Sequence, residues 1–207
     1  MNKTLLNVRE PAPIISTRTR DIHLDCVTVD DIDFVEAART LARIPRYGGQ
    51  SDEPFSVLQH LLLCDSIASY LEFNDPELRL RIILHDVHEY IIGDFPSPLK
   101  RLLDEKSGGF IKELERSIDV AVHAAAGLTE EPPEVALISK RIIKQIDHLA
   151  LFYEVNVVYP SVIPRWDLGP ASDKDLLQEV RFLTRTNDEL HVEMFNDRIL
   201  TLTNLVG

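Results

Sequence analysis

Cysteine is scarce in this chain: Cys26 and Cys64 are the only two among 207 residues, and they lie far apart without a paired spacing. Small secreted domains that depend on disulfides carry many more cysteines at short intervals, so that class of protein is excluded. Two reduced thiols in a cytoplasmic protein are the simplest interpretation.

Long apolar runs are also missing. No window approaches the roughly 18 consecutive apolar residues that a membrane-spanning helix needs, and the first ten residues contain no apolar stretch long enough for a signal peptide. With 44% apolar and 27% charged residues, the composition is that of an ordinary globular protein. We therefore expect a cytoplasmic protein with no membrane association, and its length fits a single domain.

Positively charged residues are fewer than negatively charged ones: the chain has 22 Lys and Arg residues and 34 Asp and Glu residues, so its net charge is −12. A protein that coats a nucleic acid polymer needs a broad basic face, so that function is excluded. A small phosphorylated substrate remains possible, because a few local cations and a metal ion can hold one phosphate in an acidic protein.

Helical periodicity dominates after the first 28 residues, which show no sustained period and predict an extended arm or a short hairpin packed on the body. Residues 29–207 are expected to form one all-α helical bundle. Helices are expected at about 30–42, 56–73, 75–92, 109–126, 133–158, from 172 onward and at 188–205, with loops at 93–98 and 160–170 where prolines and glycines gather.

Ionisable residues interrupt three of these apolar helices. His60 lies among leucines, His85-Asp86 follows an apolar run, and Asp147 is flanked by isoleucines and leucines. A buried carboxylate is costly without a partner or a metal ion. Three such anomalies fit one shared metal site better than three unrelated accidents.

Two imidazoles and two carboxylates suit Mn²⁺, Fe²⁺, Co²⁺, Ni²⁺ or Zn²⁺, with Mg²⁺ also possible, and suit Ca²⁺ less. Four protein ligands leave a coordination position open for water or substrate, as in catalytic sites. The alternative, a structural site, usually has closed and cysteine-rich coordination.

Two further carboxylates accompany the ligand candidates. Glu89 follows His85 by four residues and Asp86 by three, so the three are expected on one helix face, and Asp94 lies in the loop that follows. A carboxylate that does not bind the metal can exchange protons with the reacting water. His88 is expected at the surface or rim, because it is rotated by about 100° from Glu89 on an ideal helix.

This pattern resembles a known superfamily. A histidine, a His-Asp pair about 25 residues later and a lone aspartate on a later helix are similar to the signature of the HD-domain phosphohydrolases. The segment His85 to Lys100, HDVHEYIIGDFPSPLK, resembles the branch that contains bacterial 5′-deoxynucleotidases and phage dATP triphosphohydrolases. The segment Ala42 to Gly49 extends the resemblance, which covers roughly residues 30–155.

The resemblance implies an HD-type bundle with His60, His85, Asp86 and Asp147 as metal ligands, Glu89 as the acid/base and Asp94 as its support. It also implies a substrate-binding arginine in the segment 42–49. The cations suggested for phosphate are Arg43, Arg46 and Lys100, whereas Lys140, Arg141 and Lys144 are expected to be solvated. The chain departs from the deoxynucleotidase pattern at Ile44, where an aromatic residue is common, and at Val87-His88, where residues are commonly small.

The expected function is therefore metal-dependent hydrolysis of a nucleotide at its 5′ phosphate, leaning to deoxynucleotides such as dATP. A triphosphate would need further cations, for which Arg18 and Arg20 are candidates; the alternative substrate is a deoxynucleoside monophosphate. An inactive nucleotide-binding or scaffold module is the alternative from another class. By analogy with the relatives we also expect a homo-oligomer, with the apolar C-terminal helices packing on the core or on a second subunit.

Overall fold

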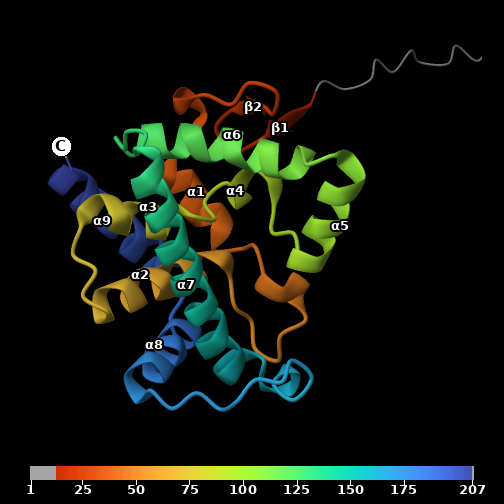
Figure 1. Ribbon diagram of the computed structural model, residues 1–207, viewed down its shortest axis with the longest axis vertical. Coiled ribbons are helices and arrows are strands. Elements are labelled where there is room, and N and C mark those ends of the chain that lie inside the picture. The colour runs from red at the N-terminus through yellow and green to blue at the C-terminus, as the bar shows by residue number, and fades with distance from the viewer. Residues whose placement is uncertain (1–12, 207) are drawn as a thin grey trace, which may run out of the picture.

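The protein is helical over most of its length in the computed structural model, which describes residues 13–206 (Figure 1). The expectation of an all-α fold is confirmed at this level. None of the helices within the described range is long and apolar enough to cross a membrane. The helices are α1 (Phe34–Leu41), α2 (Val57–Tyr70), α3 (Pro76–Leu84), α4 (Glu89–Ile92), α5 (Ser97–Ser107), α6 (Phe110–Ala125), α7 (Pro133–Val158), α8 (Lys174–Arg185) and α9 (Asp188–Val206), with 3₁₀ turns η1 (Val29–Asp31), η2 (Arg46–Gly49) and η3 (Pro160–Val162).

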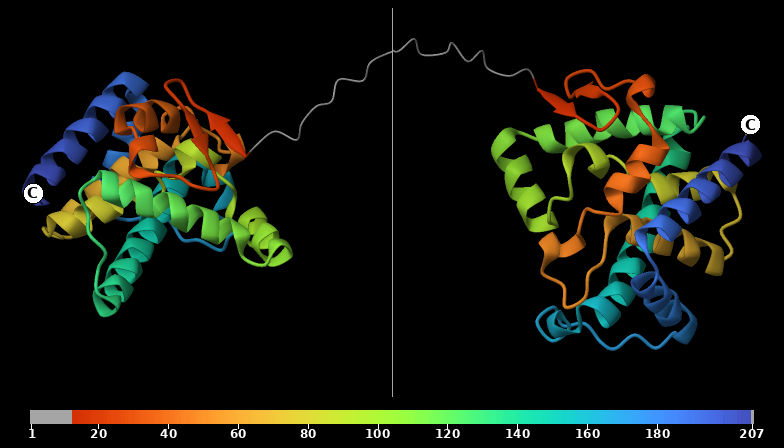
Figure 2. Two further views of the ribbon diagram at one scale, coloured as in Figure 1. Left: turned by 90° about the horizontal axis from the view of Figure 1, so that it is seen from above. Right: turned by 180° about the vertical axis from the view of Figure 1, so that it is seen from behind.

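A two-stranded hairpin precedes the helices. Strand β1 (Ile14–Ser16) pairs antiparallel with β2 (Asp21–His23), and Ile22 is completely buried. The turn is fixed to α1 because the backbone N–H of Arg18 donates to Glu36 (2.6 Å) and the Thr19 hydroxyl donates to the same carboxylate. Figure 2 shows the hairpin lying across one end of the helical body. The arm expected at residues 1–28 is thus a short hairpin where it is described, while residues 1–12 lie outside the described part.

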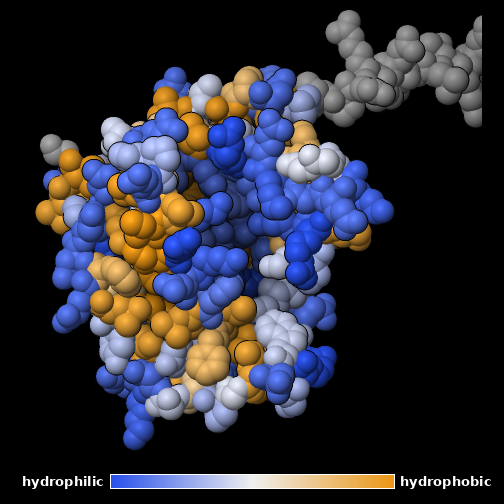
Figure 3. All heavy atoms as spheres, in the orientation of Figure 1, coloured by the Kyte–Doolittle hydropathy of each residue, from blue (hydrophilic) through white to orange (hydrophobic). Residues whose placement is uncertain are grey.

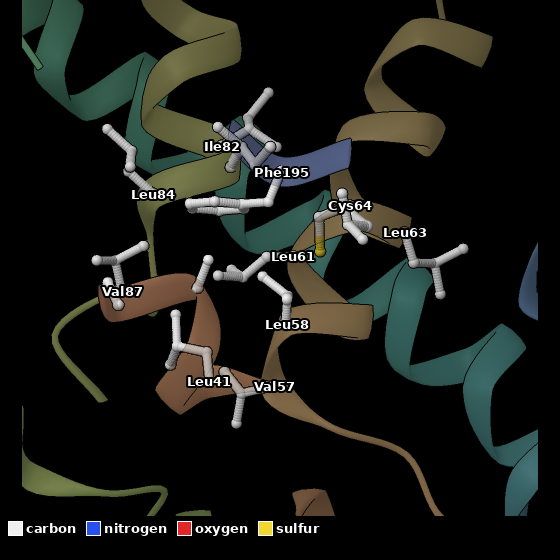
Figure 4. Packing of buried hydrophobic residues seen from close by; sticks show 14 of the residues in the cluster. Leu41, Val57, Leu58, Leu61, Leu63, Cys64, Ile82, Leu84, Val87 and Phe195 are labelled. Atoms are coloured by element: carbon white, nitrogen blue, oxygen red, sulfur yellow. The ribbon is translucent and has the colours of Figure 1, made fainter. Parts of the chain in front are cut away.

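The core is built around α2, which is apolar on nearly all sides and therefore central. Its Ser56 N-cap and Gln59 form a capping box that fixes where the helix begins. Helices α3, α7, α8 and α9 all pack on it. In Figure 4, Phe195 of α9 lies among side chains from α1, α2 and α3. This arrangement places one face of α2 against α3, which leads into the turn with His85 and Asp86, and against α7, which carries Asp147.

Two expectations about the helices are wrong. The helix expected over 75–92 is divided, because α3 ends at Leu84 and α4 begins at Glu89. Between them the backbone is overwound: the N–H groups of Val87, Glu89 and Tyr90 bond to the carbonyl three residues back, at 3.0, 3.1 and 3.0 Å.

Helix α5 was not expected at all. Its first turn contains Ser97 and Pro98, which a helix tolerates because the first N–H groups have no intrahelical partner. The loop therefore shrinks to residues 93–96. The Gly108-Gly109 pair, with φ of 73° and 94°, then turns the chain into α6.

Candidate metal centre

The structure brings the four predicted ligands together from three segments: His60 from α2, His85 and Asp86 from the turn after α3, and Asp147 from α7. His60 Nε2 lies 3.3 Å from His85 Nε2 and 3.3 Å from Asp147 Oδ1. Asp86 Oδ2 lies 3.2 Å from His85 Nε2 and 3.8 Å from His60 Nε2. Ligands bonded to one ion at about 2.1 Å are about 3.0–3.4 Å apart in octahedral or tetrahedral geometry. Three of these four separations match that spacing, and the separation of 3.8 Å between His60 and Asp86 is longer.

Both histidines present Nε2 to the cluster as an acceptor. The Nδ1 of His60 lies 2.5 Å from Glu154 Oε1, and the Nδ1 of His85 lies 2.8 Å from the carbonyl oxygen of Ile82. Ionised carboxylates and carbonyls only accept hydrogen bonds, so each Nδ1 is a donor and each Nε2 is the nitrogen on which a proton and a cation would compete. Metal-binding histidines are oriented in the same way by a partner behind the ring.

The electrostatics of the cluster favour a positive charge at its centre. Although burial disfavours the imidazolium, the adjacent Asp86 carboxylate raises the pKa of His85 to about 9. Burial also opposes ionisation of Asp86 and Asp147, yet the histidines lower the pKa of both carboxyls. The groups that stabilise a proton on Nε2 would equally stabilise a divalent cation there.

Glu154 is a central residue that the sequence did not reveal. It is fully buried on α7, two turns after Asp147, and its Oε2 accepts from Arg46 Nε (3.0 Å) and from the Tyr47 hydroxyl (2.5 Å). Burial opposes its ionisation, but Arg46 and His60 together lower the pKa of Glu154 to about 2. Glu154 thereby links the ring of His60 to a buried arginine. Glu154 follows Asp147 by seven residues, which places both on the same face of α7, and this spacing was the one sign in the sequence that Glu154 belongs to the site.

Tyr47 adopts a left-handed backbone conformation, with φ of 60° and ψ of 21°. This conformation is uncommon for a residue with a side chain and is strained. The hydrogen bond to Glu154 and an edge-on contact with Tyr159, with ring centroids 5.5 Å apart, hold it in place. The strained turn places Arg46 beside Glu154.

Glu89 has a ligand atom within 4.8 Å of one of Asp86, and the charge of Asp94 acts on its carboxyl. Burial and the nearby carboxylates of Asp86 and Asp94 raise the pKa of Glu89 to about 9. Burial likewise raises the pKa of Asp94, although Arg46 opposes the shift. Glu89 can therefore carry a proton near neutral pH while no cation is bound.

His88 is not a surface or rim residue, so that expectation is wrong. Its side chain is buried, and Nδ1 lies 2.9 Å from Asp119 Oδ1 on α6. The expectation assumed an ideal α-helix through residues 75–92. The overwound turn instead leaves ligand atoms of Asp86, His88 and Glu89 within 4.8 Å of one another.

The three predicted phosphate-binding cations differ in their surroundings. Arg46 is nearly buried, with 12% of its side chain exposed, and its charge acts on the carboxyls of Glu154 and Asp94. Lys100 is half-buried, and its Nζ lies 2.7 Å from Glu115 Oε1. Arg43 is exposed at the end of α1. Lys140, Arg141 and Lys144 are exposed, as expected.

Cys64, one turn after His60 on α2, also reaches the cluster. Its Sγ lies 3.6 Å from His60 Nε2, so a thiol adds a softer possible ligand to the set. Figure 3 shows a hollow lined by hydrophilic residues on the face where α5 and α7 flank the centre of the molecule. The side chains of Asp86 and Asp147 remain 21% and 35% exposed, which leaves them accessible from solvent.

The chain is similar to two bacterial proteins. It is 30% identical over 109 residues to the uncharacterized protein YfdR of Escherichia coli (strain K12), covering 53% of this chain and 55% of that protein. It is 31% identical over 131 residues to an uncharacterized protein of Rhodobacter capsulatus, covering 62% of this chain and 63% of that protein. The chain thus spans less than two thirds of the length of either relative, and no family model matches it.

Proposed function

We propose that the protein is a divalent-metal-dependent phosphohydrolase with an HD-type helical bundle, acting on the 5′ phosphate of deoxynucleotides. One observation carries the proposal: two histidine Nε2 atoms, each freed by a hydrogen bond at Nδ1, meet two carboxylates at distances of 3.2 to 3.8 Å. The resemblance of the segment His85–Lys100 to the deoxynucleotidase branch supports the choice of substrate.

The donor set fits the proposed ion. Imidazole and carboxylate together suit Mn²⁺, Co²⁺, Fe²⁺, Ni²⁺ or Zn²⁺, and the partly exposed side chains of Asp86 and Asp147 leave room for substrate. When bound, such an ion supplies a Lewis acid for a phosphoryl oxygen and a water of lowered pKa.

The protein groups divide the remaining work. Glu89, whose carboxyl is buried beside Asp86, accepts the proton of the attacking water and returns it to the leaving oxygen, and Asp94 supports that exchange. Arg46 offers the guanidinium nitrogens not used by Glu154 to phosphate oxygens, and Lys100 provides a second cation.

The length of the phosphate chain divides the proposal into two candidates. A triphosphate such as dATP, losing intact triphosphate, needs more cations than a monophosphate. Arg20, one candidate for this task, is engaged elsewhere: its guanidinium donates to the carbonyl of Asp30 and lies 3.8 Å from Asp33 Oδ2. This observation favours the second candidate, a 5′-deoxynucleotidase that releases inorganic phosphate from deoxynucleoside monophosphates.

Metal analysis combined with a product screen tests the proposal. Protein loaded with Mn²⁺ or Co²⁺ should bind the ion and release phosphate or triphosphate from deoxynucleotides, and chelation should abolish release. A protein that holds the ion but hydrolyses no nucleotide would instead be the alternative, a nucleotide-binding or scaffold module.

A further inference from the structure

The first two turns of α7 carry the densest group of exposed large apolar side chains in the described part of the chain. Val135, Leu137 and Ile138 are 46%, 53% and 57% exposed. Three such residues within about one helical turn are costly to leave in water, and a cluster of this kind marks an interaction surface. In the view from above in Figure 2, the start of α7 stands away from the body of the helices, so this surface is open to a partner.

A groove lies beside these residues. It has a volume of about 280 Å³, and its walls include Val135, Ile138 and Ile142 of α7 together with Leu78 of α3. Leu137 lies on the adjacent side of the helix and stands out from it. The start of α7 therefore offers both a protruding apolar side chain and an apolar recess, which is what a self-complementary surface requires.

Charges of opposite sign flank the apolar group along one face of the helix. Glu134, Leu137, Ile138 and Arg141 have the i, i+3, i+4, i+7 spacing that places residues on a single helical face, and all four are exposed. We call these four residues the α7 stripe. The stripe begins with an acid, ends with a base and is apolar between them.

We propose that the α7 stripe is an interface between two copies of this chain, whose α7 helices pair antiparallel about a twofold axis. When the axis passes between Leu137 and Ile138, Leu137 of each copy lies opposite Ile138 of the other. The same register brings Glu134 of each copy opposite Arg141 of the other, so the interface has two ion pairs around one apolar centre. A slip of one helical turn would lose both ion pairs.

The order of the charges selects a second copy as the occupant. The chain has a net charge of −12, so two copies repel over most of their surfaces and need a locally complementary face to associate. A stripe with an acid at one end and a base at the other is complementary to itself when one copy is reversed, which is the twofold arrangement. A uniformly basic segment would meet Arg141, and a uniformly acidic one would meet Glu134.

The pairing leaves the candidate metal centre open. In this register Pro133, the first residue of α7, lies opposite Ile142 of the second copy, so the paired region ends more than one turn before Asp147. The inference therefore does not rest on the proposed function. The stripe is small beside the roughly 800 Å² per partner of a standard complex, so we expect a dimer with a micromolar dissociation constant that salt weakens.

Sedimentation equilibrium over a range of protein concentrations tests the surface. The wild type should form a dimer at low salt, and Leu137→Asp should be monomeric at every concentration. Leu200→Asp, which changes a leucine that is 62% exposed on α9, is the matched control and should keep the wild-type dissociation constant. Both positions are exposed, so both variants should have the circular dichroism spectrum of the wild type.

Exchanging the charges tests the register. Glu134→Lys and Arg141→Glu should each raise the dissociation constant about 10-fold, because like charges then face each other at two places. An equimolar mixture of the two variants should recover the wild-type value, because each introduced charge then faces its opposite on the other copy.

A wild type that stays monomeric at all concentrations would overturn the proposal. So would a dimer that Leu200→Asp disrupts and Leu137→Asp does not, since the copies would then meet at α9. Equal dissociation constants for the two charge variants and for their mixture would overturn the antiparallel register.

Discussion

Replacing Glu154 with glutamine changes one buried carboxylate that orients both His60, a proposed metal ligand, and Arg46. Three donors point at its two oxygens: His60 Nδ1, Arg46 Nε and the Tyr47 hydroxyl. An amide has only one acceptor oxygen. If that oxygen stays with Arg46 and Tyr47, the NH₂ group faces His60 and favours the tautomer with its proton on Nε2, which cannot bind a cation.

The magnitude follows from two independent arguments. The pKa of Glu154 is about 2 in the folded protein against an ordinary 4.5; at about 1.4 kcal/mol per pH unit, that gap corresponds to about 3 kcal/mol of stability. Breaking a buried ion pair by removing one partner costs about 3–5 kcal/mol. We therefore expect Glu154→Gln to lose about 3 kcal/mol of unfolding free energy in chelated protein, and to bind Mn²⁺ about 10–100-fold more weakly.

The pH dependence has a definite sign. The pKa of Glu154 is lowered by folding, so its contribution is fully present above about pH 4.5 and is lost as the pH falls toward about 2. The stability difference between wild type and variant should therefore shrink over that window. Denaturant titration and calorimetric Mn²⁺ titration measure both effects, with Glu193→Gln, an exposed glutamate on α9, as the control. If Glu154→Gln matches the control in stability and in ion affinity, the reasoning about His60 is refuted.

Three further predictions concern the site directly. Asp147→Ala should lose the metal ion held with His60, His85 and Asp86, and with it all turnover. Lys144→Ala, an exposed position on the same helix, is the control and should lose neither. Full metal occupancy in Asp147→Ala would rule out the ligand assignment. Glu89→Gln should keep the bound ion and lose roughly 10²-fold or more in kcat, the usual scale for acid–base help. An unchanged kcat would remove Glu89 from the reaction. Lys100→Ala and Arg43→Ala should raise KM, more so for substrates with more phosphates. Equal KM values for mono- and triphosphates in both variants would mean that neither cation binds the phosphate chain.

The sequence could predict the grouping of four residues, His60, His85, Asp86 and Asp147, because each is an ionisable residue that interrupts an apolar helical pattern. Such a position has a high desolvation cost, so the anomaly is visible without a structure. Glu154 has the same property but was not recognised. A glutamate near the end of a long helix is usually solvated, and its buried state depends on Arg46 and Tyr47, more than 100 residues away.

His88 and α5 were misjudged for local reasons. The periodicity argument assumes an ideal α-helix. Between Leu84 and Tyr90 the backbone instead forms 3₁₀-type hydrogen bonds, and this tighter winding turns the side chain of His88 into the interior. For α5, two prolines separated by one residue predict a loop, but Pro98 falls in the first helical turn, where it costs no hydrogen bond. Both errors come from backbone geometry that composition does not encode.

Product analysis in ¹⁸O-labelled water tests the central claim, that this metal centre hydrolyses deoxynucleotides at the 5′ phosphate, most directly. Mn²⁺-loaded protein is incubated separately with dATP and dAMP, and the products are analysed by mass spectrometry. We predict that ¹⁸O enters inorganic phosphate from dAMP or triphosphate from dATP, that the deoxynucleoside carries none, and that chelation stops the reaction. Absence of product from both nucleotides with the ion bound, or product formation that chelation does not affect, would contradict the claim.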